Sequence, residues 1–452
     1  MNFPKVSSRL LSLLILFGIL AASVGTSTIA ESNSPSQSLR VNHYIVLLSD
    51  ATREDVGATA AALTRQYGGQ IHHVYDVAVR GFSVEVPEAG ARRLARDPRV
   101  KLVEKDSAAT VMGVQTGNEI QWALDRIDQR SQPLNGMYEY TKTGAGVNAY
   151  VIDSGINLPL KTNAAGEPEP NPAGIADLHG RLTNGFSVAS NTAGPVYQDY
   201  YAFAENRQGH GTSVASILAG TLYGVAKGAR IINVRIVPED GTFTASNVIA
   251  GINFAVSHHR LNPGPAVATL CLGVPNTIAV GQAIINAIDS GIVFVIPAQN
   301  RYYPDYFTMT GADACGSFPA RLGNIAFSSA YTNLNNRTTI TVGATGINDR
   351  RHLAYAYKER EWSSNYGPCV DIFAPGHYVQ AWTTLGPGGF GGTSAATPYV
   401  AGVVALYLEG KTTYDPNEVE EILKRNATAN VLADIGPGSP NLLVYSRVDE
   451  WQ

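Results

Sequence analysis

The sequence has little cysteine and little charge. Its 452 residues include three cysteines, and charged residues make up 15% of the chain, against about 25% in typical globular proteins. Three cysteines are too few for a scaffold built on disulfides. Hydrophobic residues make up 44%, which excludes a mainly disordered chain and a coiled coil. The formal net charge of −4 argues against a nucleic-acid partner.

The sequence also lacks an apolar run long enough to span a membrane. The run that comes nearest lies close to the N-terminus and is short. Lys5 and Arg9 precede an apolar run at residues 10–22, and small and polar residues follow to residue 30. This order is typical of a secretory signal peptide. As a helix the run would span about 20 Å, less than the hydrocarbon core of about 30 Å. We predict a signal peptide over residues 1–30 and a secreted, extracellular protein with no membrane contact after cleavage. An uncleaved anchor is the alternative.

Residues 31–112 have the pattern of a separate small domain. Apolar runs at 44–48, 71–79, 82–86 and 100–103 predict four strands. Two helices are expected between them, the first opened by the capping-box spacing from Thr52 to Asp55 and the second starting near Pro87. The order β-α-β-β-α-β indicates a small α+β, ferredoxin-like fold. Because no polar cluster is evident, we interpret the segment as a folding aid or inhibitor of the next domain.

The remainder, residues 113–452, alternates strand and helix patterns. Nearly continuous apolar runs predict strands buried on both faces, at 146–152, 229–237, 266–272, 292–298 and 370–374. Helical patterns occur at 210–219, 245–256, 280–290, 394–407 and 416–426. The alternation predicts an α/β fold, a mainly parallel sheet with helices on both faces. In such folds ligands bind beyond the carboxyl ends of the strands.

Four polar residues stand at those positions. Asp153 ends the first run in VIDSG, His210 opens a helix in GHGTSVA, Ser394 opens another in GGTSAATP, and Asn300 follows a strand in AQN. Acyl transfer needs a hydroxyl nucleophile, a base and a carboxylate that orients the base. Ser394, His210 and Asp153 supply these groups. The side chain of Asn300 and the backbone N–H of Ser394 can stabilise an oxyanion.

The chain order Asp, His, Ser is that of subtilisin, and it differs from the order in chymotrypsin and the α/β-hydrolases. Three further segments match one family: WALDRIDQR at 122–130, YGVAK at 223–227 and GSPN at 438–441. The chain resembles the subtilisin-like serine proteases, and within them the proteinase K and aqualysin branch. Residues 40–106 resemble the inhibitory propeptide of that family. The resemblance implies a subtilisin-like fold and a secreted serine endopeptidase made as a self-processing zymogen, cleaved within residues 108–117.

The resemblance also implies a role for each polar residue. Ser394 would be the nucleophile, and His210 the general base and then the general acid. Asp153 would orient His210, and Asn300 would stabilise the oxyanion. No cofactor is expected for catalysis.

Substrate binding is implied in the same way. Leu272 and Gly273 would form one edge strand for the substrate backbone, and residues 241–243, beginning at Gly241, the other. Because strand addition recognises mainly the backbone, polypeptides are the expected substrates, and the propeptide is the expected inhibitor of a monomeric enzyme. Gln299 stands where the family usually has Gly. Its longer side chain should narrow or polarise the primary specificity pocket.

Two cysteines and several acids match structural positions of the family. Cys315 and Cys369 match a disulfide of the aqualysin-type enzymes, which would leave Cys271 free and buried. The resemblance implies structural Ca²⁺, which requires several oxygen ligands. The matching residues are Asp371 at one calcium position and Asp125, Asp128 and Gln129 at another. Solvated surface acids are the alternative.

Two other functions remain open. One is a catalytically silenced subtilisin fold that acts as a binding or scaffold protein, which the substitutions at Gln299, Cys271 and Val274 favour and the intact triad opposes. The other is a serine hydrolase or transferase that acts on a different acyl group.

Overall fold

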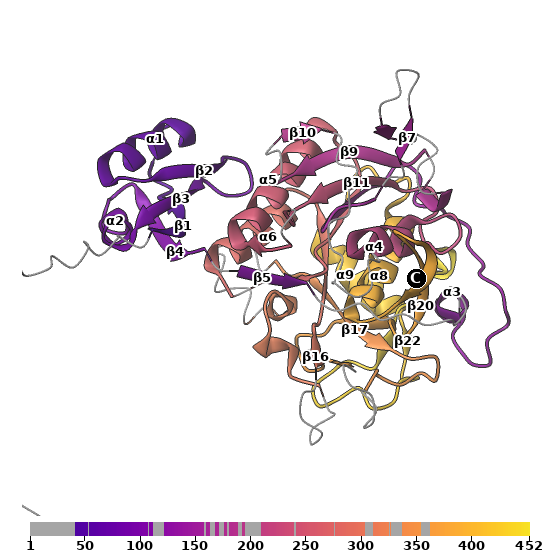
Figure 1. Cartoon of the computed structure of the whole chain (residues 1–452). Helices are drawn as coiled ribbons and strands as arrows, with labels where there is room; N and C mark the ends of the chain where they lie inside the picture. The colour runs from indigo at the N-terminus through magenta and orange to yellow at the C-terminus, as the bar shows by residue number, and fades with distance from the viewer. Residues whose placement is uncertain are drawn as a thin grey trace, which may run out of the picture. The chain divides into compact units, whose positions relative to one another are not determined.

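The computed structural model describes residues 41–111 and 122–452 with short gaps (Figure 1). The gaps are residues 53, 107, 158–159, 163–167, 171–175, 179, 189–191, 195–208, 239–240, 275, 303–310, 325, 327–336 and 354–361. The predicted signal peptide, residues 1–30, lies outside the described residues. So do residues 112–117 of the expected cleavage region.

Residues 41–105, which we call the N-terminal module, form an antiparallel sheet in the order β2-β3-β1-β4 with two connecting helices. The elements are β1 (Val41–Leu48), α1 (Val56–Tyr67), β2 (Gln70–Tyr75), β3 (Gly81–Pro87), α2 (Glu88–Leu94) and β4 (Val100–Lys105). Successive strand residues face opposite sides. Tyr44 and Val46 therefore pack in the module's own core, whereas Ile45 and Leu47 belong to a core shared with the large sheet. The predicted α+β fold is confirmed.

The start of the first helix differs from the prediction. Asp55, not Thr52, is the N-cap, and its carboxylate accepts the N–H of Ala58 at 2.8 Å. Thr52 instead lies in a turn, where its hydroxyl donates to the carbonyl of Arg99 at 3.3 Å. Threonine and aspartate can both act as N-caps. Here the side chain of Asp55 caps the helix, while that of Thr52 contacts the distant Arg99.

Residues 122–452, the large module, are built on a ten-stranded sheet. Its order is β10-β9-β11-β6-β13-β15-β17-β19-β23-β22. Neighbours from β9 to β23 are parallel, while β10 and β22 add antiparallel edges. The strands are β6 (Asn148–Asp153), β9 (Leu182–Ser187), β10 (Thr192–Gly194), β11 (Arg230–Arg235), β13 (Ala266–Thr269), β15 (Val293–Pro297), β17 (Ile340–Thr345), β19 (Ile372–Pro375), β22 (Thr428–Ala429) and β23 (Leu442–Leu443).

Helices cover both faces of this sheet, as predicted (Figure 1). In β6, Ala149 and Val151 pack in a core with α4 (His210–Ala219) and α8 (Thr393–Leu408). Tyr150 and Ile152 pack in the opposite core with α5 (Ala245–Leu261) and α6 (Ile278–Asp289). The remaining helices α3 (Trp122–Ile127) and α9 (Pro416–Asn426) contribute to the first core.

Short strands outside the large sheet complete the described structure. They are β5 (Ala108–Val111), β7 (Leu160–Thr162), β8 (Pro168–Pro170), β12 (Phe243–Thr244), β14 (Leu272–Gly273), β16 (Asn300–Tyr302), β18 (Trp362–Ser364), β20 (Val379–Thr383) and β21 (Gly386–Phe390). β5 forms its own sheet with β12 and β14, and the other six pair as β7 with β8, β16 with β18, and β20 with β21.

The sequence did not predict β17, although this strand lies between β15 and β19 and all its residues are buried. Threonines interrupt its apolar pattern. The structure satisfies Thr341, whose hydroxyl donates to the carbonyl of Ala320 at 3.1 Å. Gly343 lies against the ring of Phe373, where a Cβ atom would come within 2.3 Å of a ring carbon.

Candidate active site

The carboxyl end of β6 brings Asp153 beside His210. Asp153 is the last residue of β6, and His210 is the first residue of α4, directly after Gly209 with its φ of 67°. Nδ1 of His210 lies 2.8 Å from Oδ1 of Asp153, with side-chain exposures of 0% and 1%. The same Asp153 oxygen accepts the N–H of Ser154 at 2.7 Å. A buried carboxylate on Nδ1 leaves Nε2 of His210 as the acceptor for a proton.

Ser394 and Asn300 meet at the start of α8. Ser394 is the second residue of that helix and is fully buried. Its Oγ donates to the carbonyl of Cys271 at 3.3 Å, and Nε2 of His210 has no hydrogen-bond partner among the described residues. Oδ1 of Asn300 accepts the N–H of Thr393 at 3.0 Å. This contact ties the Asn300 amide to the helix start, where first-turn N–H groups lack intrahelical partners.

The chain's own strand β5 lies between the two edges that the sequence analysis assigned to the substrate. On one side Thr110 pairs with Gly273 and Val111 with Leu272 of β14. On the other side β5 pairs antiparallel with β12, whose Phe243 faces Ala109. Gly241 lies just before β12, with a φ of 76°. The described backbone therefore has three strands in the order β12-β5-β14.

Two acids just before β5 contact the starts of helices in the large module. Glu104 accepts the N–H groups of Ile278 and Ala279 at 2.9 and 2.6 Å, at the first residues of α6. Asp106 accepts the N–H of Ser246 at 3.0 Å, in the first turn of α5, and also its hydroxyl. Carboxylates at helix N-termini satisfy orphan donors and interact favourably with the helix dipole. These contacts attach the segment that leads from the N-terminal module into β5 to two helices, α5, which follows β12, and α6, which follows β14.

Gln299 adopts a conformation unusual for its residue type. It has a φ of 76° and is 8% exposed. Its Nε2 donates to the carbonyl of Leu272 at 3.3 Å, so the side chain connects the segment before Asn300 to edge strand β14. Glycine adopts a positive φ at no steric cost, whereas other residues are strained by about 1–3 kcal/mol.

The three cysteines have distinct environments. Cys315 and Cys369 form a disulfide with Cα atoms 5.2 Å apart. Cys271 is free and buried next to the site. Burial, and then the charge of Asp153, raise the pKa of its thiol. Because the thiolate is the reactive form, this environment disfavours Cys271 as a nucleophile.

The surroundings of Asp371 do not fit a calcium ion. Its Oδ2 accepts the N–H of Thr341 at 2.8 Å, and the ammonium of Lys424 lies 3.8 Å from Oδ1. Lys424 is also 2.8 Å from Glu420. Burial lowers the pKa of Lys424, but the charges of Glu420 and Asp371 outweigh it and raise the pKa overall. The ammonium of Lys424 therefore already lies beside these carboxylates, where a calcium ion would have to bind.

Asp125 and Asp128 fit a cation better. Asp125 accepts the N–H groups of Asn135 and Gly136 at 3.1 and 2.6 Å. Oδ2 of Asp128 accepts the N–H of Glu139 at 2.5 Å, while its buried Oδ1 has no partner among the described residues. Burial, followed by the charges of Asp125 and Glu139, raises the pKa of Asp128 to about 6. Gln129 donates instead to two nearby carbonyls.

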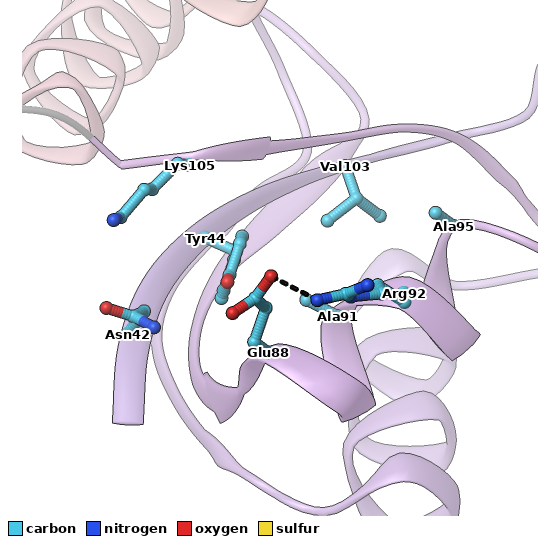
Figure 2. Close-up of a pocket in the computed structure, with 8 residues that line it drawn as sticks. All are labelled: Asn42, Tyr44, Glu88, Ala91, Arg92, Ala95, Val103 and Lys105. Atoms are coloured by element: carbon cyan, nitrogen blue, oxygen red, sulfur yellow. Dashed lines mark hydrogen bonds and ion pairs between the residues drawn. The ribbon is translucent and has the colours of Figure 1, made fainter. Parts of the chain in front are cut away.

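A hollow of about 370 Å³ lies on the N-terminal module and contains none of these residues (Figure 2). Its lining comes from β1, α2, β4 and the residue after α2: Asn42, Tyr44, Glu88, Ala91, Arg92, Ala95, Val103 and Lys105. Glu88 and Arg92 form an exposed ion pair across one turn of α2.

Among the described residues, no helix is long and apolar enough to cross a membrane.

Two known family models match this chain, one in the large module and one in the N-terminal part. Residues 144–442 match the model described as "Subtilase family", and residues 30–112 match "Peptidase inhibitor I9". The chain belongs to the subtilase family. It is a subtilisin-like serine endopeptidase with an inhibitor domain ahead of the peptidase domain.

Individual relatives agree with this assignment. The "Extracellular serine proteinase" of a Thermus species is 38% identical over 84% of this chain and 78% of its own length. The "Alkaline serine exoprotease A" of Vibrio alginolyticus is 34% identical over 85% of this chain, which spans 61% of that relative. The crystal structure of a cold adapted subtilisin-like serine proteinase covers 72% of this chain and 97% of its own, with 34% identity and a TM-score of 0.55.

We expect the Gln299 side chain to limit which residue this subtilase accepts before the scissile bond. Gln299→Gly removes the side chain that reaches Leu272, so large residues should gain kcat/KM relative to small ones by about tenfold or more, as expected for a change of one or two methylenes. Cleavage of a peptide series that varies only at this residue measures the change. Gln299→Asn keeps an amide but is one methylene shorter, so it should give an intermediate preference. An unchanged ranking of peptides in both variants would contradict the expectation.

Proposed function

We propose that this subtilase is secreted as an inactive precursor that cleaves off its own propeptide, using Ser394, His210, Asp153 and Asn300. The pairing of β5 with both β12 and β14 is the observation that carries the proposal. Residues 108–111 already run as the middle strand, as the backbone of an extended substrate would. The boundary between residues 112 and 113 comes one residue after the end of β5, so the propeptide is residues 31–112 and the peptidase residues 113–452.

The first step transfers a proton and forms a covalent bond. Nε2 of His210 takes the proton from Oγ of Ser394, and that oxygen attacks the carbonyl carbon of the scissile peptide. Asp153 accepts a hydrogen bond from Nδ1 and stabilises the imidazolium that results. The 2.8 Å contact between His210 and Asp153 supports these roles. His210 then donates the proton to the leaving amine, and water hydrolyses the acyl-enzyme by the reverse sequence.

Charge that develops on the carbonyl oxygen is stabilised by two donors. These are Nδ2 of Asn300 and the backbone N–H of Ser394, in the first turn of α8. The contact between Oδ1 of Asn300 and the N–H of Thr393 supports this orientation of the amide. The reaction uses the protein's own side chains and no cofactor.

The same strand pairing supports the proposed substrates and inhibitor. Substrates are polypeptides in extended conformation, because Leu272, Gly273 and β12 offer backbone groups. Until it is removed, the propeptide is the inhibitor, since β5 occupies the position between the edge strands. The mature enzyme acts outside the cell as a monomer, without membrane or nucleic-acid partners.

The intact mass of the secreted protein tests the proposal. The parent should lose the residues before Gly113, and the Ser394→Ala protein should keep its propeptide. N-terminal sequencing of the parent should place the new terminus at Gly113, two residues after the last residue of β5.

A new terminus upstream of Ala108 would contradict the assignment of β5 to the substrate position. If the parent and the Ser394→Ala protein both keep the whole propeptide, the result would favour a catalytically silenced fold that acts by binding. Cleavage of small esters without cleavage of peptides would indicate a different acyl substrate.

Asn300→Leu should lower kcat by about 10²–10³ with little change in KM, as loss of one oxyanion donor does in related enzymes. The donor acts on the transition state and not on the bound substrate. Steady-state kinetics on a peptide substrate measure both constants. Asn300→Asp keeps the size and the acceptor for Thr393 but removes the N–H donor, so it should show a comparable loss. Normal kcat in either variant would exclude this role.

The proposal includes a structural Ca²⁺ at Asp128 and Asp125, where the unpartnered Oδ1 of Asp128 is the first ligand. Removing calcium with a chelator should destabilise the folded enzyme, by about 2.7 kcal/mol if the starting concentration is about 100 times Kd. Thermal unfolding of the Ser394→Ala protein, with and without calcium, measures the effect. Asp128→Asn should abolish the calcium-dependent shift, and Asp371→Asn should leave it intact. If Asp371→Asn abolishes the calcium-dependent shift and Asp128→Asn does not, the calcium site is at Asp371.

A further inference from the structure

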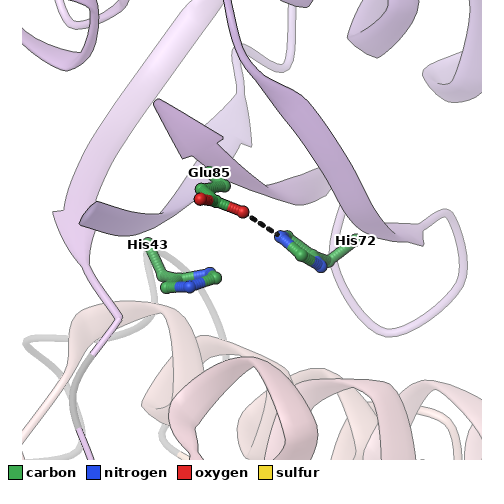
Figure 3. A group of neighbouring side chains, drawn as sticks. All are labelled: His43, His72 and Glu85. Carbon is green, nitrogen blue, oxygen red and sulfur yellow. Dashed lines mark ion pairs between the residues drawn. The ribbon is translucent and has the colours of Figure 1, made fainter. Parts of the chain in front are cut away.

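Three polar side chains converge on the N-terminal module, far in sequence from the catalytic residues (Figure 3). They are His43 of β1, His72 of β2 and Glu85 of β3. Nε2 of His72 lies 3.4 Å from Oε2 of Glu85, and the rings of His43 and His72 have centroids 4.9 Å apart. One ligand atom from each residue lies within 4.8 Å of the other two. The expectation that this domain has no polar cluster is therefore wrong.

The strand register explains why the cluster forms. His43 and Glu85 are direct partners across β1 and β3. In β2 the register with β3 shifts between Ile71 and His73, so that His72 is the additional residue of a bulge. Gln70 is the direct partner of Glu85, so alternation along β2 places His72, two residues further on, on the face that carries Glu85. Because of the bulge, His73 and not His72 pairs with Ser83.

We propose that His43, His72 and Glu85 bind a divalent transition-metal ion, with Zn²⁺ as the ion that best suits two imidazoles and one carboxylate. Tetrahedral Zn²⁺ at its usual bond lengths separates ligand atoms by about 3.4 Å. Nε2 of His72 and Oε2 of Glu85 already have this separation, and the ligand atom of His43 must approach them by at most about 1.4 Å from the 4.8 Å limit. Side-chain rotation accomplishes this, because His72 and Glu85 are each 35% exposed. Solvent reaches the cluster and supplies the fourth ligand.

The ion would connect three neighbouring strands at one point. β2 is an edge strand and is joined to the sheet only through β3. Metal bonds from β2 to both β3 and β1 would oppose its separation from the sheet. His43 also shares a face of β1 with Ile45 and Leu47, which pack against the large module. The ion thus stabilises the face of the inhibitor domain that docks on the peptidase.

The test uses the full-length Ser394→Ala protein, which keeps the N-terminal module whether or not the parent processes itself. Titration of the metal-free protein with Zn²⁺, followed by calorimetry, should give one site, and Co²⁺ should give the visible absorption of a tetrahedral ion. His43→Gln, His72→Gln and Glu85→Gln should each weaken Zn²⁺ binding by roughly tenfold or more. Zn²⁺ should raise the unfolding temperature of the starting protein more than that of the three cluster variants, since binding to the folded state stabilises it.

His73→Gln is the matched control. His73 neighbours His72 but stacks on Tyr75 instead of joining the cluster, so its replacement should leave Zn²⁺ affinity unchanged. Unfolding curves in metal-free buffer identify any variant that does not fold, and the isosteric Glu85→Gln keeps the test valid in that case. The proposal fails if the folded starting protein binds no Zn²⁺. It also fails if Zn²⁺ affinity survives in all three cluster variants or falls equally in His73→Gln.

Discussion

A parallel sheet buried on both faces confines polar chemistry to the ends of its strands. All six residues of β6 are buried, because alternate side chains pack against helices on opposite faces. Asp153 is the last of these residues, and its charge stays buried beside the donors Ser154 and His210. Removing one partner of such a pair leaves an uncompensated buried charge, at a cost of about 3–5 kcal/mol. The position of the base therefore depends on the complete packing of the sheet.

The other two residues of the candidate triad, His210 and Ser394, are positioned by the starts of helices. His210 and Ser394 each lie within the first two residues of a helix, after Gly209 and Gly392 with φ values of 67° and 111°. Glycine takes these angles without strain, so each helix can begin at the residue that follows the glycine. Each helix start brings a reactive side chain to the carboxyl edge of the large sheet, and the start of α8 also brings the backbone N–H of Ser394 there.

Inhibition and docking in this protein use backbone groups more than side chains. β5 adds a strand between β12 and β14, and Glu104 and Asp106 accept N–H groups at the starts of α6 and α5. Asn253 of α5 accepts two further N–H groups, those of Val77 and Ala78. Contacts to backbone depend little on the identity of the contacted residue. The same edge strands can therefore hold the propeptide first and varied substrates later.

The sequence by itself determined the class of fold, the two parts of the chain and the four candidate catalytic residues. These depend on local patterns, namely buried runs, helical periodicity and short glycine-rich motifs. Tertiary structure decided what depends on register and on charges from distant segments. It placed β5 between the edge strands, put Lys424 beside Asp371, and brought His43, His72 and Glu85 together from three strands. The pairing register decides which residues of different strands lie near one another, and no local pattern in the sequence records that register.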